Sequence, residues 1–376
     1  MTTNYNKIIR AFTVAQSIDF VEPFIKKLQM NGFEIVTVSS DGPQLQTLRN
    51  LGVKTIVVDM YRRMSPFKDM RSLWQLIKVF CKEKPYMVHS MTPKAGMLCM
   101  LAAWITRVPK RVHTFTGLVW PTATGLTRKI LMATDWVTCA CATHVIPEGE
   151  GVKDDLQKFI TKKQMKVLGF GNCKGVDMDF WRKQVHPNVN KENGMFYFTF
   201  VGRIVSDKGI NELVEAFTKL YKKYSNIRLR LIGPFEDDLD PISQETRDRI
   251  VTNEAIEAVG SRSKIELVQY YSASDCFVFP SYREGFPNVL LEAGAMGLPS
   301  IVTNINGSRE IIKDGVNGLI IQSKDVDALE KAMERMINDK DIYVKMAENA
   351  RPMIESRFEQ SFVQKCLLEF YRDVIE

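Results

Sequence analysis

The chain contains 376 residues, of which 45% are hydrophobic and 25% are charged, a composition that is typical of globular proteins and excludes a low-complexity chain. Its length is too great for one typical core and favours two domains. The net charge of +7 is unevenly distributed, because residues 1–185 carry 27 Lys and Arg against 14 Asp and Glu, a net of +13, and the remainder has a net of −6. An anionic partner for the first half is one explanation, and lysines that only solvate helices are the other.

Cysteine content and hydropathy indicate the cellular compartment of the protein. The seven cysteines include no C-x-x-C pair, which indicates reduced thiols rather than a disulfide framework or a zinc site. The N-terminal residues contain no long apolar segment, so no signal peptide is expected. The longest apolar-rich stretch, at 97–105, is shorter than the ~20 residues that a membrane helix needs. We therefore expect a cytoplasmic protein.

The first half alternates apolar, β-rich segments with segments of helical periodicity. Strands are expected at 6–14, 33–40, 53–60, 86–90 and 110–117, and helices at 19–32, 44–52, 73–85 and 95–108. The pattern restarts with strands at 195–203, 227–233, 276–281 and 299–303 and with helices at 211–225, 264–274 and 288–297. Such alternation predicts two α/β domains, each a parallel sheet with helices on both faces.

The polar stretch 181–194 is the expected linker. The predicted domains are 1–185, 186–355 and a C-terminal helix at 356–376 that packs back on the first domain. Open parallel sheets bind ligands beyond the carboxyl ends of their strands, so candidate site residues should follow strands.

The stretch REGFPNVLLEAGAMGLPS (283–300) places one glutamate in a loop and another in the following helix. A helix that begins after a loop presents backbone N–H groups, which favour anionic or hydroxyl-rich ligands. Glu292, about one turn into the helix, is placed to accept two hydrogen bonds from a diol such as a ribose. Together with Glu284 in the loop, this arrangement suits a sugar nucleotide. Two solvated glutamates are the alternative, which the small apolar neighbours of Glu292 disfavour.

The stretch FVGRIVSDKGINELVEAF (200–217) has a similar strand–loop–helix pattern. Arg203 can bind phosphate oxygens through its forked guanidinium, and Lys208 supplies a point charge. A pair of unrelated surface cations is the alternative. The context favours phosphate binding. The carboxylates of DDLD (237–240) are expected to lie in a solvated loop.

With these two motifs the chain resembles the family 4 retaining glycosyltransferases, whose signature of two glutamates separated by seven residues matches Glu284 and Glu292. Residues 88–120 and 167–181 resemble the branch that builds bacterial lipid-linked oligosaccharides for capsule, O-antigen or glycoprotein glycans. The resemblance covers most of the chain. It implies the GT-B fold, in which two Rossmann-like, doubly wound domains face a central cleft.

The resemblance also implies roles. Arg203 and Lys208 would bind the donor diphosphate and form the catalytic set with Glu284, and Glu292 would bind the ribose. The other expected donor-binding residues are Gly202, Phe286, Pro287, Asn288, Val289, Ser261, Arg262 and Ser17. The resemblance further implies a hexosyl- or N-acetylhexosaminyltransferase that retains the anomeric configuration, requires no metal and has no cofactor.

On the acceptor side the chain departs from the family pattern. Ser17 and Ile18 stand where many relatives have a Gly-Gly pair. Thr116 stands where many have a histidine near the reacting carbon. The remaining cleft candidates are His113, which is alternatively a structural strand residue, His89, and Lys94, which could meet an acceptor phosphate.

Segment 60–84 combines Lys and Arg with Met, Tyr, Phe and Trp, which fits contact with an anionic membrane; the alternative is a core-packed helix with a basic outer face. No nucleic-acid-binding module is recognised. The sequence therefore predicts a peripheral enzyme at the inner face of the cell membrane, which transfers sugar from a nucleotide-sugar donor, expected to be UDP-linked, to a polyprenyl-diphosphate-linked saccharide. A GT-B sugar-nucleotide epimerase and a non-catalytic nucleotide-sugar-binding protein are the alternatives.

Overall fold

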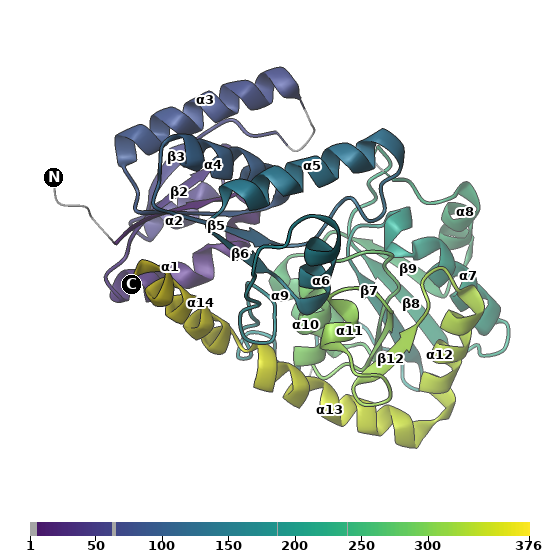
Figure 1. Cartoon of the computed structure of the whole chain (residues 1–376). Coiled ribbons are helices and arrows are strands. Elements are labelled where there is room, and N and C mark those ends of the chain that lie inside the picture. The colour runs from purple at the N-terminus through teal and green to yellow at the C-terminus, as the bar shows by residue number, and fades with distance from the viewer. Residues whose placement is uncertain (1–5, 62–64, 186, 239) are drawn as a thin grey trace. The chain divides into compact units, whose positions relative to one another are not determined.

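The computed structural model describes residues 6–61, 65–185, 187–238 and 240–376, which form two compact units (Figure 1). Unit 1 comprises Met1–Gly175 and Gln360–Glu376, and unit 2 comprises Val176–Glu359. Each unit contains one parallel six-stranded sheet, which confirms the prediction of two doubly wound α/β domains. The roles that we expect of the two domains stay a prediction.

Unit 1 is built on a sheet of strand order β3-β2-β1-β4-β5-β6. Its strands are β1 (Lys7–Ala11), β2 (Glu34–Ser39), β3 (Lys54–Val57), β4 (Met87–Met91), β5 (Lys110–Phe115) and β6 (His144–Pro147). The order reverses between β1 and β4, because β2 and β3 continue to one side and β5 and β6 to the other. This reversal is the topological switch point, where ligands of doubly wound sheets bind.

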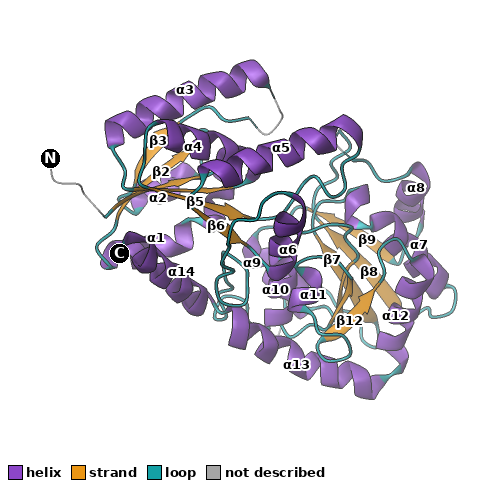
Figure 2. Ribbon diagram, viewed as in Figure 1, coloured by secondary structure: helices purple, strands orange, loops and turns teal. Residues whose placement is uncertain are grey.

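Helices lie on both faces of the sheet of unit 1 (Figure 2). They bury two apolar layers, one on each face. One layer contains the 3₁₀ helix η1 (Ala15–Phe20), α1 (Glu22–Met30), α2 (Leu45–Asn50) and the C-terminal α14 (Gln360–Ile375). The other contains α3 (Pro66–Glu83), α4 (Pro93–Ile105), α5 (Gly125–Cys141) and α6 (Glu150–Phe159). Helix α14 thus belongs to unit 1 although it follows unit 2 in the sequence.

Unit 2 has the strand order β12-β11-β10-β7-β8-β9. Its strands are β7 (Phe196–Val201), β8 (Ile227–Ile232), β9 (Ile256–Gly260), β10 (Cys276–Phe279), β11 (Ser300–Thr303) and β12 (Gly318–Ile321). Strand β7 reads FYFTFV, a nearly continuous apolar run, because helices bury both faces of a parallel sheet. The switch point of unit 2 lies between β7 and β10.

The connections of unit 2 are helical. They are η2 (Ser206–Lys208), α7 (Ile210–Tyr221), α8 (Gln244–Thr252), α9 (Lys264–Ser272), α10 (Asn288–Ala295), α11 (Ser308–Ile311), α12 (Val326–Asn338) and α13 (Lys340–Phe358). Helix α7 packs against α12, and α10 packs against α13. Across the described residues of both units, no helix combines the length and the apolar character needed to cross a bilayer.

Candidate functional site

Two loops meet at the switch point of unit 2, one after β7 and one after β10. The backbone N–H of Tyr282 donates to the carbonyl of Asp207 at 2.8 Å, which joins them. Gly209 ends the first loop with a φ of 71°, and a Cβ there would collide with the carbonyl oxygen of Pro280. This approach therefore requires glycine at position 209. The two sequence motifs thus form one structural centre.

The central contact is an ion pair between Lys208 and Glu284, both largely shielded from solvent. The hydroxyl of Ser281 donates to Glu284 Oε1 at 3.0 Å. Thr303, at the end of β11, donates its hydroxyl to the carbonyl of Ser281. Neither Ser281 nor Thr303 was predicted from the sequence, although each follows or ends a strand at the expected edge. They fix the loop from which Glu284 projects.

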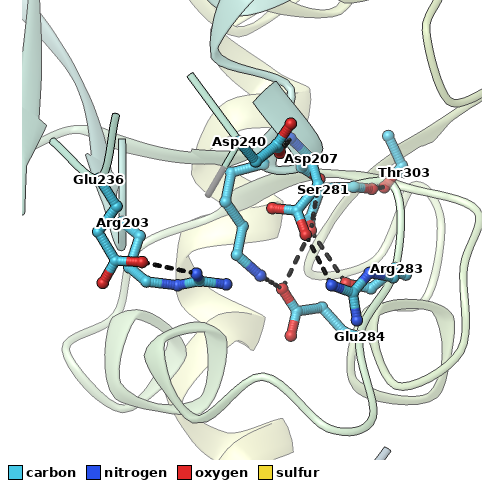
Figure 3. Close-up of polar contacts among 9 residues, drawn as sticks. Arg203, Asp207, Glu236, Asp240, Ser281, Arg283, Glu284 and Thr303 are labelled. Atoms are coloured by element: carbon cyan, nitrogen blue, oxygen red, sulfur yellow. Dashed lines mark hydrogen bonds and ion pairs between the residues drawn. The ribbon is translucent and has the colours of Figure 1, made fainter. Parts of the chain in front are cut away.

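Two further ion pairs flank this contact. Arg203 Nη1 lies 2.9 Å from Glu236 Oε2, and Arg283 Nη2 lies 3.0 Å from Asp207 Oδ2. In the view of Figure 3 the carboxylate of Glu284 lies between the guanidinium groups of Arg203 and Arg283. Burial alone would lower the pKa of Arg203, but the hydrogen bond and charge of Glu236, together with the charges of Asp207 and Glu284, raise it. We call Arg203, Lys208, Arg283 and Glu284 the charged centre.

The loop after β8 braces the charged centre. The N–H of Ile204 donates to the carbonyl of Pro234 at 2.8 Å, so the two loops run side by side. Further along, Asp240 Oδ2 accepts from the N–H of Asp207 at 2.6 Å. The prediction of a solvated loop at 237–240 is therefore wrong for Asp240. The sequence analysis missed this contact because it depends on the adjacency of β7 and β8 in the sheet.

Glu292, the second glutamate of the motif, follows Glu284 closely in sequence but lies within a helix instead of a loop. Glu292 is buried in α10, one turn from the helix start at Asn288. The nearby Tyr271 donates its hydroxyl to the carbonyl of Val289 at 3.4 Å. Burial, followed by the negative charge of Glu292, raises the pKa of Tyr271 well above its ordinary value. Glu292 is therefore a buried residue and not one of the helix surface, and its role in binding stays a prediction.

The remaining donor-side candidates occupy different environments. Phe286 is buried, with its ring 5.4 Å from that of Phe358 in an edge-on contact. Pro287 precedes α10, and its carbonyl accepts from Leu290. The other candidates lie after strands: Gly202 follows β7, and the exposed Ser261 and Arg262 follow β9.

The two histidines proposed for the acceptor side are buried in unit 1. His113 Nδ1 lies 2.8 Å from the hydroxyl of Ser90, and its ring packs where a side chain at Gly96 would be. His89 is held between Thr114 at 2.7 Å and Tyr371 of α14 at 2.5 Å. Burial lowers the pKa of His113 to about 3, so its ring stays neutral near pH 7. These contacts support the structural alternative, and a cleft role for either histidine stays a prediction.

The other acceptor-side candidates lie near the carboxyl edge of the same sheet. Lys94, in the first turn of α4, binds both carboxylate oxygens of Asp69, at 2.8 and 3.0 Å. Thr116 follows β5 and Ser17 lies in η1; both are half-buried. The sequence analysis did not single out Thr13 and Thr92, whose hydroxyls meet at 2.7 Å.

These observations can be compared with known proteins. Residues 182–353 match the family described as Glycosyl transferases group 1, and residues 11–141 match the family Glycosyl transferase 4-like. The chain is 32% identical to the capsular polysaccharide biosynthesis glycosyltransferase CapM of Staphylococcus aureus, over 98% of both chains. The chain belongs to the group 1 glycosyltransferases. It is therefore a transferase, as the family resemblance implied.

Two further relatives extend the comparison. The chain is 29% identical, over 87% of its length and 85% of the relative, to the UDP-Gal:α-D-GlcNAc-diphosphoundecaprenol α-1,3-galactosyltransferase of Escherichia coli. Anabaena Alr3699/HepE, solved in complex with UDP-glucose, has a TM-score of 0.80 at 17% identity, with 98% of this glycosyltransferase and 99% of that chain covered. The structural likeness supports the predicted GT-B fold.

Proposed function

We propose that this glycosyltransferase transfers a hexosyl or N-acetylhexosaminyl group from a UDP-sugar to a saccharide linked to polyprenyl diphosphate, with retention of the anomeric configuration. The observation that carries the proposal is the charged centre at the switch point of unit 2, where three cations and Glu284 lie together. The E. coli relative is named for a UDP-sugar donor and a diphosphoundecaprenol acceptor. The epimerase and binding-protein alternatives lack such support among the relatives described above.

In this proposal the charged centre stabilises the departing nucleotide. Cleavage of the sugar–phosphate bond leaves negative charge on the diphosphate and positive charge on the sugar carbon. Arg203 and Lys208 stabilise the first through charge-assisted hydrogen bonds. Glu284 accepts hydrogen bonds from sugar hydroxyls. The N-terminus of α10, at Asn288 and Val289, is the positive end of the helix dipole and favours the negative charge of the diphosphate.

The rest of the nucleotide is assigned to the residues around α10 and β9. Glu292 would accept both hydroxyls of the ribose. Ser261 and Arg262 would frame the base, while the Gly202 and Phe286–Pro287 backbone would line the donor. In unit 1, Ser17 would bind a donor phosphate and Lys94 would bind an acceptor phosphate. Thr116 would lie near the reacting carbon of the sugar.

We also propose that unit 1 binds an anionic membrane at the cytoplasmic face. Three neighbouring helices expose tryptophans: Trp74 on α3, Trp104 on α4 and Trp136 on α5. On α3, Phe67 is 92% exposed, and Lys78 lies 5.7 Å from the ring centre of Trp74. Aromatic rings beside cations suit the interface of an anionic bilayer. Arg62, Arg63 and Met64, part of the predicted surface, lie outside the described residues.

A transfer assay tests the reaction. The purified enzyme is incubated with radiolabelled UDP-sugars, one at a time, and with polyprenyl-diphosphate-linked monosaccharides, and label in the lipid is counted. We expect one donor to be used, the new linkage to keep the anomeric configuration by NMR, and Glu284→Gln to abolish transfer. Glu215→Gln on the exposed face of α7 is the matched control. An epimerised donor without transfer to lipid would support the alternative enzyme.

A flotation assay tests the membrane proposal. We expect wild-type protein to float with vesicles that contain phosphatidylglycerol and to stay behind with phosphatidylcholine alone. The double variant Phe67→Ala, Trp74→Ala should lose this binding, whereas Ile265→Ala, an exposed apolar residue of unit 2, should retain it. Equal flotation of wild type and the double variant would refute a role for α3.

A further inference from the structure

The ion pairs of the charged centre differ in their exposure. The side chains of Lys208 and Glu284 are 13% and 17% exposed, whereas those of Arg203 and Glu236 are 40% and 30% exposed. Water and dissolved salt screen an exposed pair, so it contributes little and breaks readily. Arg203 is therefore the cation more accessible to an incoming phosphate, and its ion pair with Glu236 is weaker than that of Lys208 with Glu284.

Glu236 is kept beside Arg203 by its backbone. The contact between Ile204 and Pro234 fixes the start of its loop. The next residue, Asp237, pairs with Arg247 of α8, which also lies 5.0 Å from the ring centre of Phe235. The loop is therefore braced on both sides of Glu236, while the Glu236 side chain itself reaches solvent. Its carboxylate can turn towards water without any movement of the loop.

We propose that Glu236 is the exchangeable counter-ion of Arg203. In the donor-free enzyme it holds the guanidinium at the switch point, and it releases the guanidinium when a nucleotide phosphate arrives. The inference rests on the proposed function, because it takes a nucleoside diphosphate as the ligand of this centre.

The exchange has a consequence for affinity. A phosphate must compete with Glu236 for Arg203, and the displaced carboxylate stays close enough to repel the diphosphate. Glu236 therefore weakens nucleotide binding and promotes release of the nucleoside diphosphate product. It is a positioning residue, since it acts through Arg203 and contacts no reacting atom.

Calorimetric titration with UDP tests the proposal. We expect Glu236→Gln to bind UDP about 3- to 10-fold more tightly than wild type, and the gain to shrink in high salt. Glu236→Asp keeps the charge and should restore nearly wild-type affinity. In the transfer assay, Glu236→Gln should lower the donor KM and increase inhibition by UDP. Melting curves would establish that each variant is folded.

The matched control is Asp238→Asn. It removes the same charge from the same loop, two positions after Glu236, at an exposed side chain that the bracing contacts described above do not involve. We expect its UDP affinity to stay within about twofold of wild type. An equal gain in this variant would overturn the proposal in favour of a general field effect.

The remaining outcomes separate the two proposals. UDP binding by wild type with equal or weaker binding by Glu236→Gln would overturn the counter-ion role and leave the donor site intact. Failure of wild type to bind UDP, GDP or ADP would overturn the donor site and the role of Glu236 together.

Discussion

The two units share a topology but place different chemistry at their switch points. In unit 2 the ion pair of Lys208 and Glu284 spans the gap between the ends of β7 and β10. In unit 1 the corresponding gap, between β1 and β4, is spanned by the neutral hydroxyls of Thr13 and Thr92. The gap at the switch point is therefore spanned by charged side chains in one unit and by uncharged hydrogen-bonding groups in the other.

The difference extends to the titratable groups beneath each edge. In unit 1, His89 and His113 lie inside the sheet layer with hydrogen-bond partners, and burial lowers the pKa of both. In unit 2 the charged residues are partly solvent-accessible and paired with one another. We infer that the edge of unit 2 is arranged for an anionic ligand, whereas the buried polar groups of unit 1 chiefly hold the fold.

Among the variants that test this comparison between the units, the largest expected effect comes from removing the central cation of unit 2. Lys208→Met should lower the transfer rate by about 10²- to 10³-fold, because it removes a group that stabilises developing charge on the leaving nucleotide. The melting temperature should fall as well, because Glu284, whose side chain is 17% exposed, loses its ion partner. Initial rates of transfer and thermal unfolding curves measure the two effects on the same preparation.

Lys219→Met is the matched control for this prediction. Lys219 lies on α7 of the same unit and pairs with Asp327 at 3.1 Å on the surface. We expect the control to retain transfer activity. A similar loss of activity in both variants would show that Lys208 has no specific role in catalysis. The charged contact at the switch point of unit 2 would then not distinguish it functionally from that of unit 1.

The next prediction concerns the buried polar groups of unit 1. His113→Ala should destabilise the protein by about 2–4 kcal/mol, because it leaves a cavity beside Gly96 and deprives Ser90 of its partner. UDP binding by the folded variant should be unchanged. Urea unfolding and calorimetric titration measure these two quantities.

His144→Ala provides the comparison. His144 is half-buried at the start of β6 and bonds to its neighbour Thr143 at 2.9 Å, so its loss should cost less than about 1 kcal/mol. If His113→Ala were as stable as wild type but inactive in transfer, the histidine would act at the acceptor site. The buried histidines of unit 1 could then no longer be regarded as groups that only stabilise the fold.

Much of the fold and of the candidate site of unit 2 could be predicted from the sequence, because both depend on local patterns. The apolar run of β7 is followed at once by Gly202 and Arg203, and the run of β10 is followed shortly by Glu284. Polar residues directly after a buried strand must lie at the carboxyl edge of the sheet. The sequence therefore indicated the edge of the sheet and the charged residues there, and the ligand class that it indicated stays a prediction.

The missed features depend on contacts between distant segments. The pair of Arg203 and Glu236 requires β7 and β8 to be neighbours, and the contact of His89 with Tyr371 joins residues 282 positions apart. Helix α5 was also missed. Leu126 and Trp136 are exposed on it, so its apolar residues do not follow a single buried stripe.

Helix α5 provides a further test of the buried chemistry in unit 1, through the pH dependence of stability. Asp135 is buried in this helix, and burial raises the pKa of its carboxyl group to about 7. Between its unfolded pKa near 4 and this folded value, the native state holds a proton that the unfolded state has released. The contribution of Asp135 to the free energy of unfolding therefore falls as pH rises from about 4 to 7, and is constant above that range.

Asp135→Asn removes this titration. We expect the variant to be more stable than wild type by roughly 4 kcal/mol at pH 8.5, since a shift of about three pKa units costs ~1.4 kcal/mol per unit. The difference should vanish towards pH 4, where both side chains are neutral. Urea unfolding across this range measures both, and Asp155→Asn on the neighbouring helix α6 serves as the control. Parallel pH profiles for wild type and Asp135→Asn would mean that the carboxylate reaches water in the folded state. Water would then reach the interior of unit 1 beside α5, although the lowered pKa values of His89 and His113 indicate that solvent is excluded around them.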